Sequence, residues 1–391
     1  MPRLPERLDR LVSVDLLRGL VMVIMALDHT RDFFTNAQFS PTDLSKTSVA
    51  LFLTRWITHF CAPVFVFLAG TGAFLYASHG KTKNELAIFL ITRGLWLIFL
   101  QIAVETFAWD FTTDYTQIEG GVLWAIGWSM IALAGLVFLP VGLTSVFGIL
   151  MIASHNLLDG VRPEDLGELG PLWAVLHTGD IIRISPNLAL EPFYPLIPWI
   201  GVMAAGYGFG TVLLLERDVQ RRVLLRLGGL LTVLFILLRS INLYGDPKPW
   251  SPQDSYTFSL LSFLNCEKYP PSLLYLLMTL GPAIAVLPWF DRKPGWLGGF
   301  FITFGRVPLF YYLLHLLLIH QLVIALAWVT GRSASAFLGD PFTPGYPDGC
   351  GYDLPILYLL WVLVVLSLYP ICRRFASLKA HRRHWRWLRY L

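Results

Sequence analysis

The sequence predicts an all-α protein, a polytopic membrane helix bundle of about ten transmembrane helices with both termini in the cytoplasm. Three observations lead to this prediction. The 391 residues are 55% hydrophobic and 14% charged, with a mean hydropathy of +0.59, whereas soluble domains are roughly half apolar and about a quarter charged. Apolar segments of about 20 residues recur along the chain, and the basic residues gather in alternate connections.

Ten apolar segments are long enough to cross a bilayer as helices. The first superficially resembles a signal peptide, but Asp15 and Arg18 interrupt its apolar core and no small-residue cleavage site follows. We therefore expect it to remain as the first helix. The ten predicted spans lie near residues 11–31, 50–77, 85–108, 120–139, 142–158, 193–215, 222–243, 270–289, 303–329 and 354–372.

The connections between these spans alternate in charge, which predicts their orientation. Loops rich in Lys and Arg generally stay in the cytoplasm. The intervening connections are acidic or rich in Gly, Pro and aromatic residues, so we expect them to face outward. An even number of spans agrees with basic segments at both ends. The basic clusters are Arg3 to Arg10, Lys81 and Lys83, Arg217 to Arg222, Arg292 and Lys293, and Arg373 to Arg389.

The spans follow one another without a polar block large enough to fold separately, so we expect one transmembrane domain over residues 1–372. The tail 373–391 mixes Arg, His and Trp at helical spacing, which favours a basic amphipathic helix lying on anionic membrane lipids in the cytoplasm. Long outward connections rich in Trp, Tyr and Pro could build a lid or vestibule; they are 159–192, 244–269 and 331–353.

Composition and motifs exclude several function classes. The net charge of +4 comes from the basic clusters that set orientation, so nucleic acid is not an expected partner. The four cysteines are too few and too scattered for a disulfide framework or a metal site, and only Cys266 and Cys350 could pair. The sequence contains no His-Glu-x-x-His, Gly-x-x-x-x-Gly-Lys or Gly-x-Ser-x-Gly motif, so a zinc hydrolase, an ATP-driven pump and a serine hydrolase lack support.

Ionisable residues inside the spans are the strongest functional signals, because a charge at mid-bilayer costs a few kcal/mol even on lenient scales. An inner layer of arginines could hold a phosphorylated cofactor in bidentate hydrogen bonds. The alternatives are snorkelling to lipid headgroups and pairing of Arg18 with Asp15. Arg306 lies in Gly305-Arg306-Val307-Pro308, where a broken helix start could leave backbone donors open. The inner arginines are Arg18, Arg93 and Arg306.

A second layer, nearer the middle of the bilayer, is rich in histidine, which can take and return a proton near neutrality. Asp28 and His29 are neighbours on a helix and point about 100° apart, so they do not form a dyad by themselves. His29 could instead meet His59 or His315, with Asp28 or Asp32 orienting one of them. A buried structural histidine is the alternative for each. His155 lies at a span end, where we expect it to be solvated.

Four islands of sequence, the first of which consists of two stretches in the first helix, carry a resemblance to a known family. The first helix contains Ser13–Leu20 (SVDLLRGL) and Met25–His29 (MALDH), and later helices contain Ala62–Gly70 (APVFVFLAG), Gly121–Gly127 and Pro308–His315 (PLFYYLLH). In this order they resemble the heparan-alpha-glucosaminide N-acetyltransferase family and its bacterial relatives. The first island is fairly specific, and the four together cover about half of the chain.

The resemblance implies a transmembrane acyltransferase in the inner membrane of a bacterium. In such an enzyme acyl-CoA, here acetyl-CoA, donates from the cytoplasmic side, and a sugar or glycolipid accepts on the far side. A histidine serves as the base or as a transient acyl carrier. In the lysosomal member it lies between the first two helices, but residues 35–48 contain no histidine here, so His29 or His59 would take the role.

The expected mechanism combines both layers. The inner arginines hold the phosphates of CoA, His29 or His59 deprotonates the acceptor, His315 orients or polarises it, and Asp28 supports the histidines. No metal is expected. Two hypotheses from other classes stay open: a proton-coupled secondary transporter of a small polar solute, in which the same groups relay protons, and a structural subunit without chemistry. Whether the chain forms a homodimer is also left open.

Overall fold

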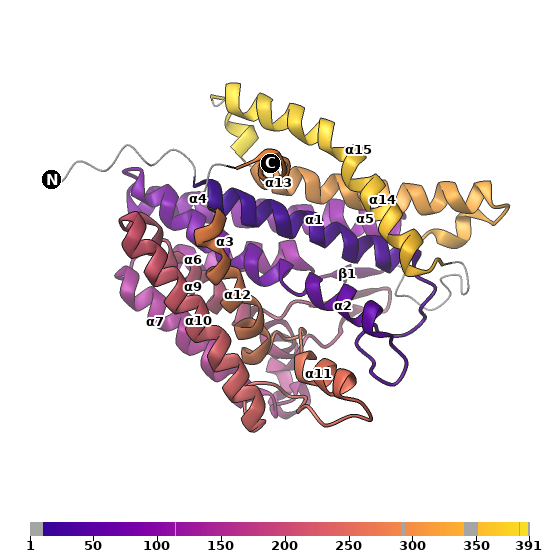
Figure 1. The fold of residues 1–391 in the computed structure, drawn as a ribbon, viewed down its shortest axis with the longest axis horizontal. Coiled ribbons are helices and arrows are strands. Elements are labelled where there is room, and N and C mark those ends of the chain that lie inside the picture. The colour runs from indigo at the N-terminus through magenta and orange to yellow at the C-terminus, as the bar shows by residue number, and fades with distance from the viewer. Residues whose placement is uncertain (1–10, 114, 291–293, 340–350, 383, 390–391) are drawn as a thin grey trace.

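A computed structural model describes residues 11–113, 115–290, 294–339, 351–382 and 384–389. It confirms an all-α bundle (Figure 1). The longer helices are α1 (Val12–Phe34), α3 (Cys61–Ser78), α4 (Lys83–Leu100), α6 (Val122–Leu136), α7 (Val141–Ser154), α9 (Leu196–Phe209), α10 (Arg217–Ile241), α12 (Leu273–Phe290), α13 (Trp296–Arg306), α14 (Pro308–Val329) and α15 (Leu354–His381). The shorter ones are α2 (Val49–Thr58), α5 (Thr106–Asp110), α8 (Gly170–Trp173) and α11 (Tyr256–Leu264).

Every predicted span corresponds to a helix or a helix pair. Within the described residues, eight helical stretches are long and apolar enough to cross a membrane by length and composition. The two predicted spans outside this set are α1, which carries three aspartates and two arginines, and α6, which has only 15 residues. Both lie inside the bundle and bury residues on several faces, so packing partners rather than lipid surround much of them.

Three boundaries differ from the expectation. The span near 50–77 is divided between α2 and α3, because the helix breaks at His59 and Phe60. The span near 303–329 is α14, preceded by the separate helix α13. The last predicted span ends at residue 372, whereas α15 continues to His381 and carries Lys379 and His381 in its last turn.

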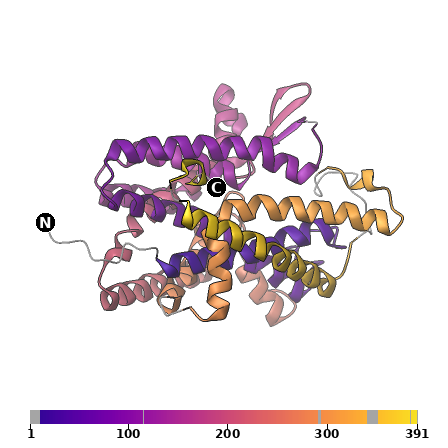
Figure 2. The same ribbon diagram turned by 90° about the horizontal axis from the view of Figure 1, so that it is seen from above.

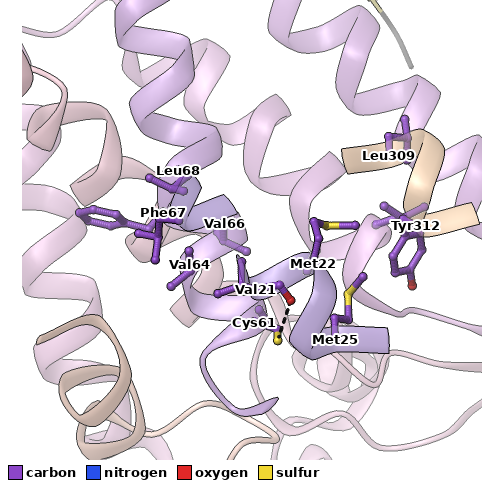
Figure 3. Packing of buried hydrophobic residues seen from close by; sticks show 14 of the residues in the cluster. Val21, Met22, Met25, Cys61, Val64, Val66, Phe67, Leu68, Leu309 and Tyr312 are labelled. Carbon is purple, nitrogen blue, oxygen red and sulfur yellow. Dashed lines mark hydrogen bonds between the residues drawn. The ribbon is translucent and has the colours of Figure 1, made fainter. Parts of the chain in front are cut away.

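Helix α1 runs through the centre of the bundle. It contacts α2, α3, α12, α13, α14 and α15, and Figure 1 shows α13 to α15 along one of its sides. Figure 2 shows the long α14 and the helix of residues 83–110 both running lengthwise through the molecule. In Figure 3, Met22 and Met25 of α1 lie near Tyr312 of α14, and the Cys61 Sγ of α3 donates to the Val21 carbonyl at 3.3 Å.

Helices α1 and α13 approach closely enough that their backbones touch at two glycines. A Cβ on Gly19 would clash with the Phe301 carbonyl, and a Cβ on Gly305 would clash with the Asp15 carbonyl. Neither clash involves a flexible side-chain end, so the helices themselves would have to separate. This contact positions Asp15 and Arg18 against the end of α13.

Replacement of Gly19 by Ala is therefore expected to lower the free energy of unfolding by about 3 kcal/mol, the upper range for overpacking a core. Thermal unfolding in detergent measures the effect. Gly299→Ala on the partner helix α13 is the control, because a Cβ at Gly299 would meet no atom within 4 Å. Equal melting of the two variants would contradict the close α1–α13 contact.

A small sheet, which the sequence did not predict, stands among the connections. Strands β1 (Gln117–Glu119), β2 (Ile182–Ser185) and β3 (Leu188–Glu191) are arranged in the order β1-β3-β2. β1 pairs in parallel with β3, and β2 and β3 form a hairpin. The pairing joins the connection after α5 to the one before α9.

The expected pairing of two cysteines stays a prediction, because Cys350 lies outside the described residues. Cys266 is buried and carries a free thiol in the structure. Burial, together with the nearby Asp246 carboxylate, raises the pKa of this thiol. The thiolate form, which is the reactive one, is therefore suppressed at neutral pH.

Candidate functional site

Two cavities lie along α1, one at each end of the helix. The N-side cavity adjoins residues 11–25 of α1 and has a volume of about 1630 Å³. The C-side cavity adjoins residues 25–35 and has a volume of about 1070 Å³. Four residues line both cavities and therefore form a common wall: Met25, Phe65, Val122 and Tyr312.

The C-side cavity is built by the second half of α1 and by the connections expected to form a vestibule. Each of the three long connections lines it, through Glu191, through residues 265–269, and through Phe337 and Gly351. The segment 37–43 and Glu119 complete the lining. The three long connections thus contribute to one cavity at one end of the bundle. Lys268 supplies a buried ammonium group to its wall.

His29 lines the C-side cavity and pairs with a histidine from a distant helix. Its Nδ1 lies 2.7 Å from Nε2 of His315, and the two rings stack with centroids 4.9 Å apart. Trp109 packs its edge against the His29 ring at 5.2 Å. Of the two partners considered for His29, the structure selects His315.

The hydrogen bonds of this pair fix which nitrogen of His29 is available. His315 Nδ1 lies 2.9 Å from the Tyr311 carbonyl oxygen. A carbonyl can only accept, so this Nδ1 carries the proton and the Nε2 of a neutral His315 is an acceptor. His29 Nδ1 must then donate to it. Neutral His29 is left with a lone pair on Nε2, which is the arrangement of a general base oriented by a second group.

Asp28 is held by arginines. One of its carboxylate oxygens, Oδ1, lies 2.8 Å from Arg31 Nη1, and the other forms an ion pair with Arg55. Arg31 also pairs with Asp32. Both oxygens of Asp28 are thus engaged by guanidinium groups, and the group that orients His29 is His315 instead. The four charges stabilise one another where isolated charges would be costly.

His59 lies at the break between α2 and α3 and also lines the C-side cavity. Its ring packs edge-on against Tyr275 at 5.4 Å, and its carbonyl accepts a hydrogen bond from the Tyr275 hydroxyl at 2.7 Å. Its Nδ1 has no hydrogen-bond partner in the described part of the chain. His59 therefore shares the cavity with His29 but does not belong to the His29–His315 pair.

The inner arginines lie at the N-side cavity or beside it. Arg18 and Arg93 line it. Arg18 donates to Asp15 and, through Nε, to the Gly305 carbonyl at 2.6 Å, so the pairing considered as its alternative role exists. Arg306 is the last residue of α13, not the first residue of α14, and its Nε lies 3.8 Å from Asp15 Oδ2.

Several site residues were not singled out from the sequence. Arg55 is a charge within a predicted span, so the rule that identified the other intramembrane charges would have found it. Tyr312 links the two cavities, and its hydroxyl donates to Glu105 Oε1 at 2.7 Å. Lys268 and Tyr269 lie in a connection, where sequence gives no such signal. Burial opposes ionisation of Tyr269, but Lys268 and Arg55 outweigh it and hold the Tyr269 pKa below its ordinary value.

The expectation that His155 is solvated is wrong. This side chain is 1% exposed, because the chain after α7 turns back and covers it with the segment that contains His177. The sequence could not indicate this contact, since the two histidines come from different connections.

Comparison with known families gives a match. The family model described as heparan-alpha-glucosaminide N-acetyltransferase, catalytic, matches residues 10–239, more than half of the chain. The matched region contains α1 to α4, α6, α7 and α9, and with them Arg18, His29, His59 and Arg93. No curated protein gives a match to the chain.

Proposed function

The chain belongs to the heparan-alpha-glucosaminide N-acetyltransferase catalytic family. From this premise we propose that it transfers an acyl group from acyl-CoA to a sugar or glycolipid across the membrane, and that the acyl group is acetyl. The family supports a membrane N-acetyltransferase in general terms. One observation carries the finer proposal: two cavities at opposite ends of α1 share a wall, and the His29–His315 pair stands directly beside it.

In this proposal the N-side cavity receives acyl-CoA. Arg18 and Arg93 line it, as do Lys81 and Arg217 from the connections predicted to be cytoplasmic. Guanidinium groups suit the phosphates of CoA, and Arg306 beside Asp15 adds positive charge near the same end. The positive-inside rule supports a cytoplasmic orientation of this end, on the side where acyl-CoA is made. In a bacterium, a protein with this orientation would lie in the inner membrane.

The C-side cavity receives the acceptor. Its carboxylates and aromatic rings, including Glu119, Glu191, Trp109 and Tyr269, offer hydrogen bonds and flat surfaces to a sugar. The acyl thioester reaches the common wall from the N-side, and the acceptor amine or hydroxyl approaches from the C-side. Binding both substrates at one wall supplies the positioning part of the rate enhancement.

His29 then acts as the base. Its Nε2 takes the proton of the acceptor amine or hydroxyl as the nucleophile forms a bond to the thioester carbonyl carbon. The carbon–sulfur bond breaks, and the CoA thiolate regains a proton from His29. His315 holds the required tautomer. Because His29 lines the acceptor's cavity and not the donor's, direct attack by the acceptor is favoured over an acyl-histidine intermediate.

Arg93→Gln is expected to raise KM for acetyl-CoA about 10- to 100-fold, which corresponds to the loss of one hydrogen bond to a charged group. Steady-state kinetics with acetyl-CoA measure the change. Acetyl-pantetheine, a thioester without the nucleotide phosphates, is the control substrate, and the variant should use it as well as the wild type does. A similar KM increase with both thioesters would contradict a phosphate-binding role.

The test of the function is acetyl transfer by the purified protein. Acetyl-CoA and glucosamine are supplied, and release of the free thiol is followed together with formation of the acetylated sugar. The proposal expects both products in equal amounts and thiol release that depends on the acceptor. A burst of thiol without acceptor would indicate an acyl carrier instead. Proton-coupled uptake without acetyl-CoA binding would contradict the enzyme altogether.

A further inference from the structure

A second cluster of ionisable groups, made of two buried histidines and one partly exposed aspartate, lies away from both cavities. His155 begins the short 3₁₀ turn His155–Leu158 at the end of α7, Asp159 follows that turn, and His177 lies in the π-helical turn Ala174–Thr178. One donor atom from each side chain can be chosen so that all three lie within 4.8 Å of one another. None of these residues lines the site described above.

The geometry of this His-Asp-His cluster approaches that of a tetrahedral metal centre. Bonds of about 2.0–2.1 Å to nitrogen and oxygen place neighbouring ligand atoms roughly 3.3 Å apart around Zn²⁺. His177 Nε2 and Asp159 Oδ1 are already 3.2 Å apart. The three chosen donor atoms lie no more than 4.8 Å apart, so His155 would need to move toward the other two by about 1.5 Å at most to reach this spacing.

Three of the four histidine nitrogens lack partners. Both residues are 1% exposed, and neither nitrogen of His155 nor Nδ1 of His177 has a hydrogen-bond or ion-pair partner among the described residues. The fourth nitrogen, His177 Nε2, contacts Asp159 Oδ1 at 3.2 Å. A buried polar group without a partner typically costs about 1–3 kcal/mol. Several such nitrogens in one place therefore indicate that a ligand binds there.

We propose that His155, Asp159 and His177 bind a divalent transition metal ion, with Zn²⁺ as the ion that the ligand set suits best. Imidazole nitrogens and one carboxylate form a common zinc set. The neighbouring amide supports it, because Asn156 Nδ2 donates to Asp159 Oδ2 at 2.9 Å while Asn156 Oδ1 accepts from the Leu273 backbone at 2.9 Å. Such partners commonly orient metal ligands.

The ion would have a structural role. It would tie the end of α7 to the turn that leads into the β2–β3 hairpin, whose last residue Glu191 lines the C-side cavity. Asp159 is partly exposed, with 23% of its side chain accessible, which gives the ion a path from solvent. The site would therefore fix one wall of that cavity without taking part in chemistry.

The test measures metal bound to the full-length protein purified in detergent, after dialysis against Zn²⁺ and removal of loosely bound ions. One zinc per chain is expected in the wild type and in His381→Ala, an exposed histidine that serves as the control. His155→Ala and His177→Ala should lose the ion, and Asn156→Ala should weaken binding about 10- to 100-fold. Chelation should lower Tm of the wild type, because the ion binds only the folded chain.

Asp159→Asn distinguishes loss of the metal site from misfolding, because Asp159 is partly exposed and asparagine has nearly the same shape as aspartate. It should fold with an unchanged helical spectrum, lose zinc, and show no Tm change on chelation. A Co²⁺-loaded wild type should show the visible absorption of a tetrahedral nitrogen and oxygen site, absent from this variant. Zinc content that is equal in all variants would overturn the proposal. So would a wild type without bound metal, which would leave a His-Asp ion pair only.

Discussion

His29→Ala is expected to lower kcat for acetyl transfer about 10²- to 10⁴-fold, the usual contribution of a general base. Its KM for acetyl-CoA should change little, because His29 does not line the donor cavity. The loss follows from the free lone pair on Nε2, the one basic atom that the His29–His315 hydrogen bond leaves available. Single-turnover transfer to glucosamine measures the chemical step directly.

Variants of His315 separate positioning from a merely structural role. His315→Gln can still accept from His29 Nδ1 through its amide oxygen, so it should keep more activity than His315→Ala and a pH profile closer to the wild type. Thermal unfolding should be similar for the two. His381→Ala, on the exposed end of α15, is the control for loss of a histidine. Full activity in His29→Ala would refute the base assignment.

Asp28→Ala is expected to lower the free energy of unfolding by about 3–5 kcal/mol, the cost of breaking a buried ion pair from one side. Arg31 and Arg55 would each lose the carboxylate oxygen that they contact, while their side chains remain 4% and 16% accessible. Unfolding in detergent, followed by the helical signal, measures this change.

The matched control for this change is Asp43→Ala. Asp43 pairs with Lys46 at 3.9 Å, and 34% of the Asp43 side chain and 61% of the Lys46 side chain are accessible to solvent. Such surface pairs contribute about 0–1 kcal/mol. Both variants replace an ion-paired aspartate by alanine, so the difference between their free energies of unfolding reports the effect of burial. An Asp28→Ala variant as stable as Asp43→Ala would contradict the structural importance of the buried network.

Local and periodic features of the fold could be predicted from the sequence. Hydropathy identified the longer helices other than α13, because lipid-facing and core-facing residues are both apolar in a membrane bundle. The Arg18–Asp15 pair was foreseeable because residues three apart share a helix face. The strands escaped prediction because segments of three or four residues carry too little periodic signal.

The pairing of the histidines could not be settled from the sequence. His29 and His315 are 286 residues apart, and hydropathy does not say which faces of two spans meet. From the sequence, His59 was as good a candidate for the partner of His29 as His315. In the structure, His59 lies at the break between α2 and α3 and its ring packs against Tyr275. The zinc-ligand cluster escaped for the same reason, since the segments around His155 and His177 meet only through tertiary folding.

The central claim is that donor and acceptor enter from opposite faces and meet at the wall formed by Met25, Phe65, Val122 and Tyr312. Its most direct test uses vesicles containing the protein with the N-side cavity facing outward and a membrane-impermeant amino sugar trapped inside. Acetyl-CoA is added only outside. The account predicts that acetylated sugar accumulates inside with the wild type and not with His29→Ala. Acetylation only when both substrates are on the same side would contradict it.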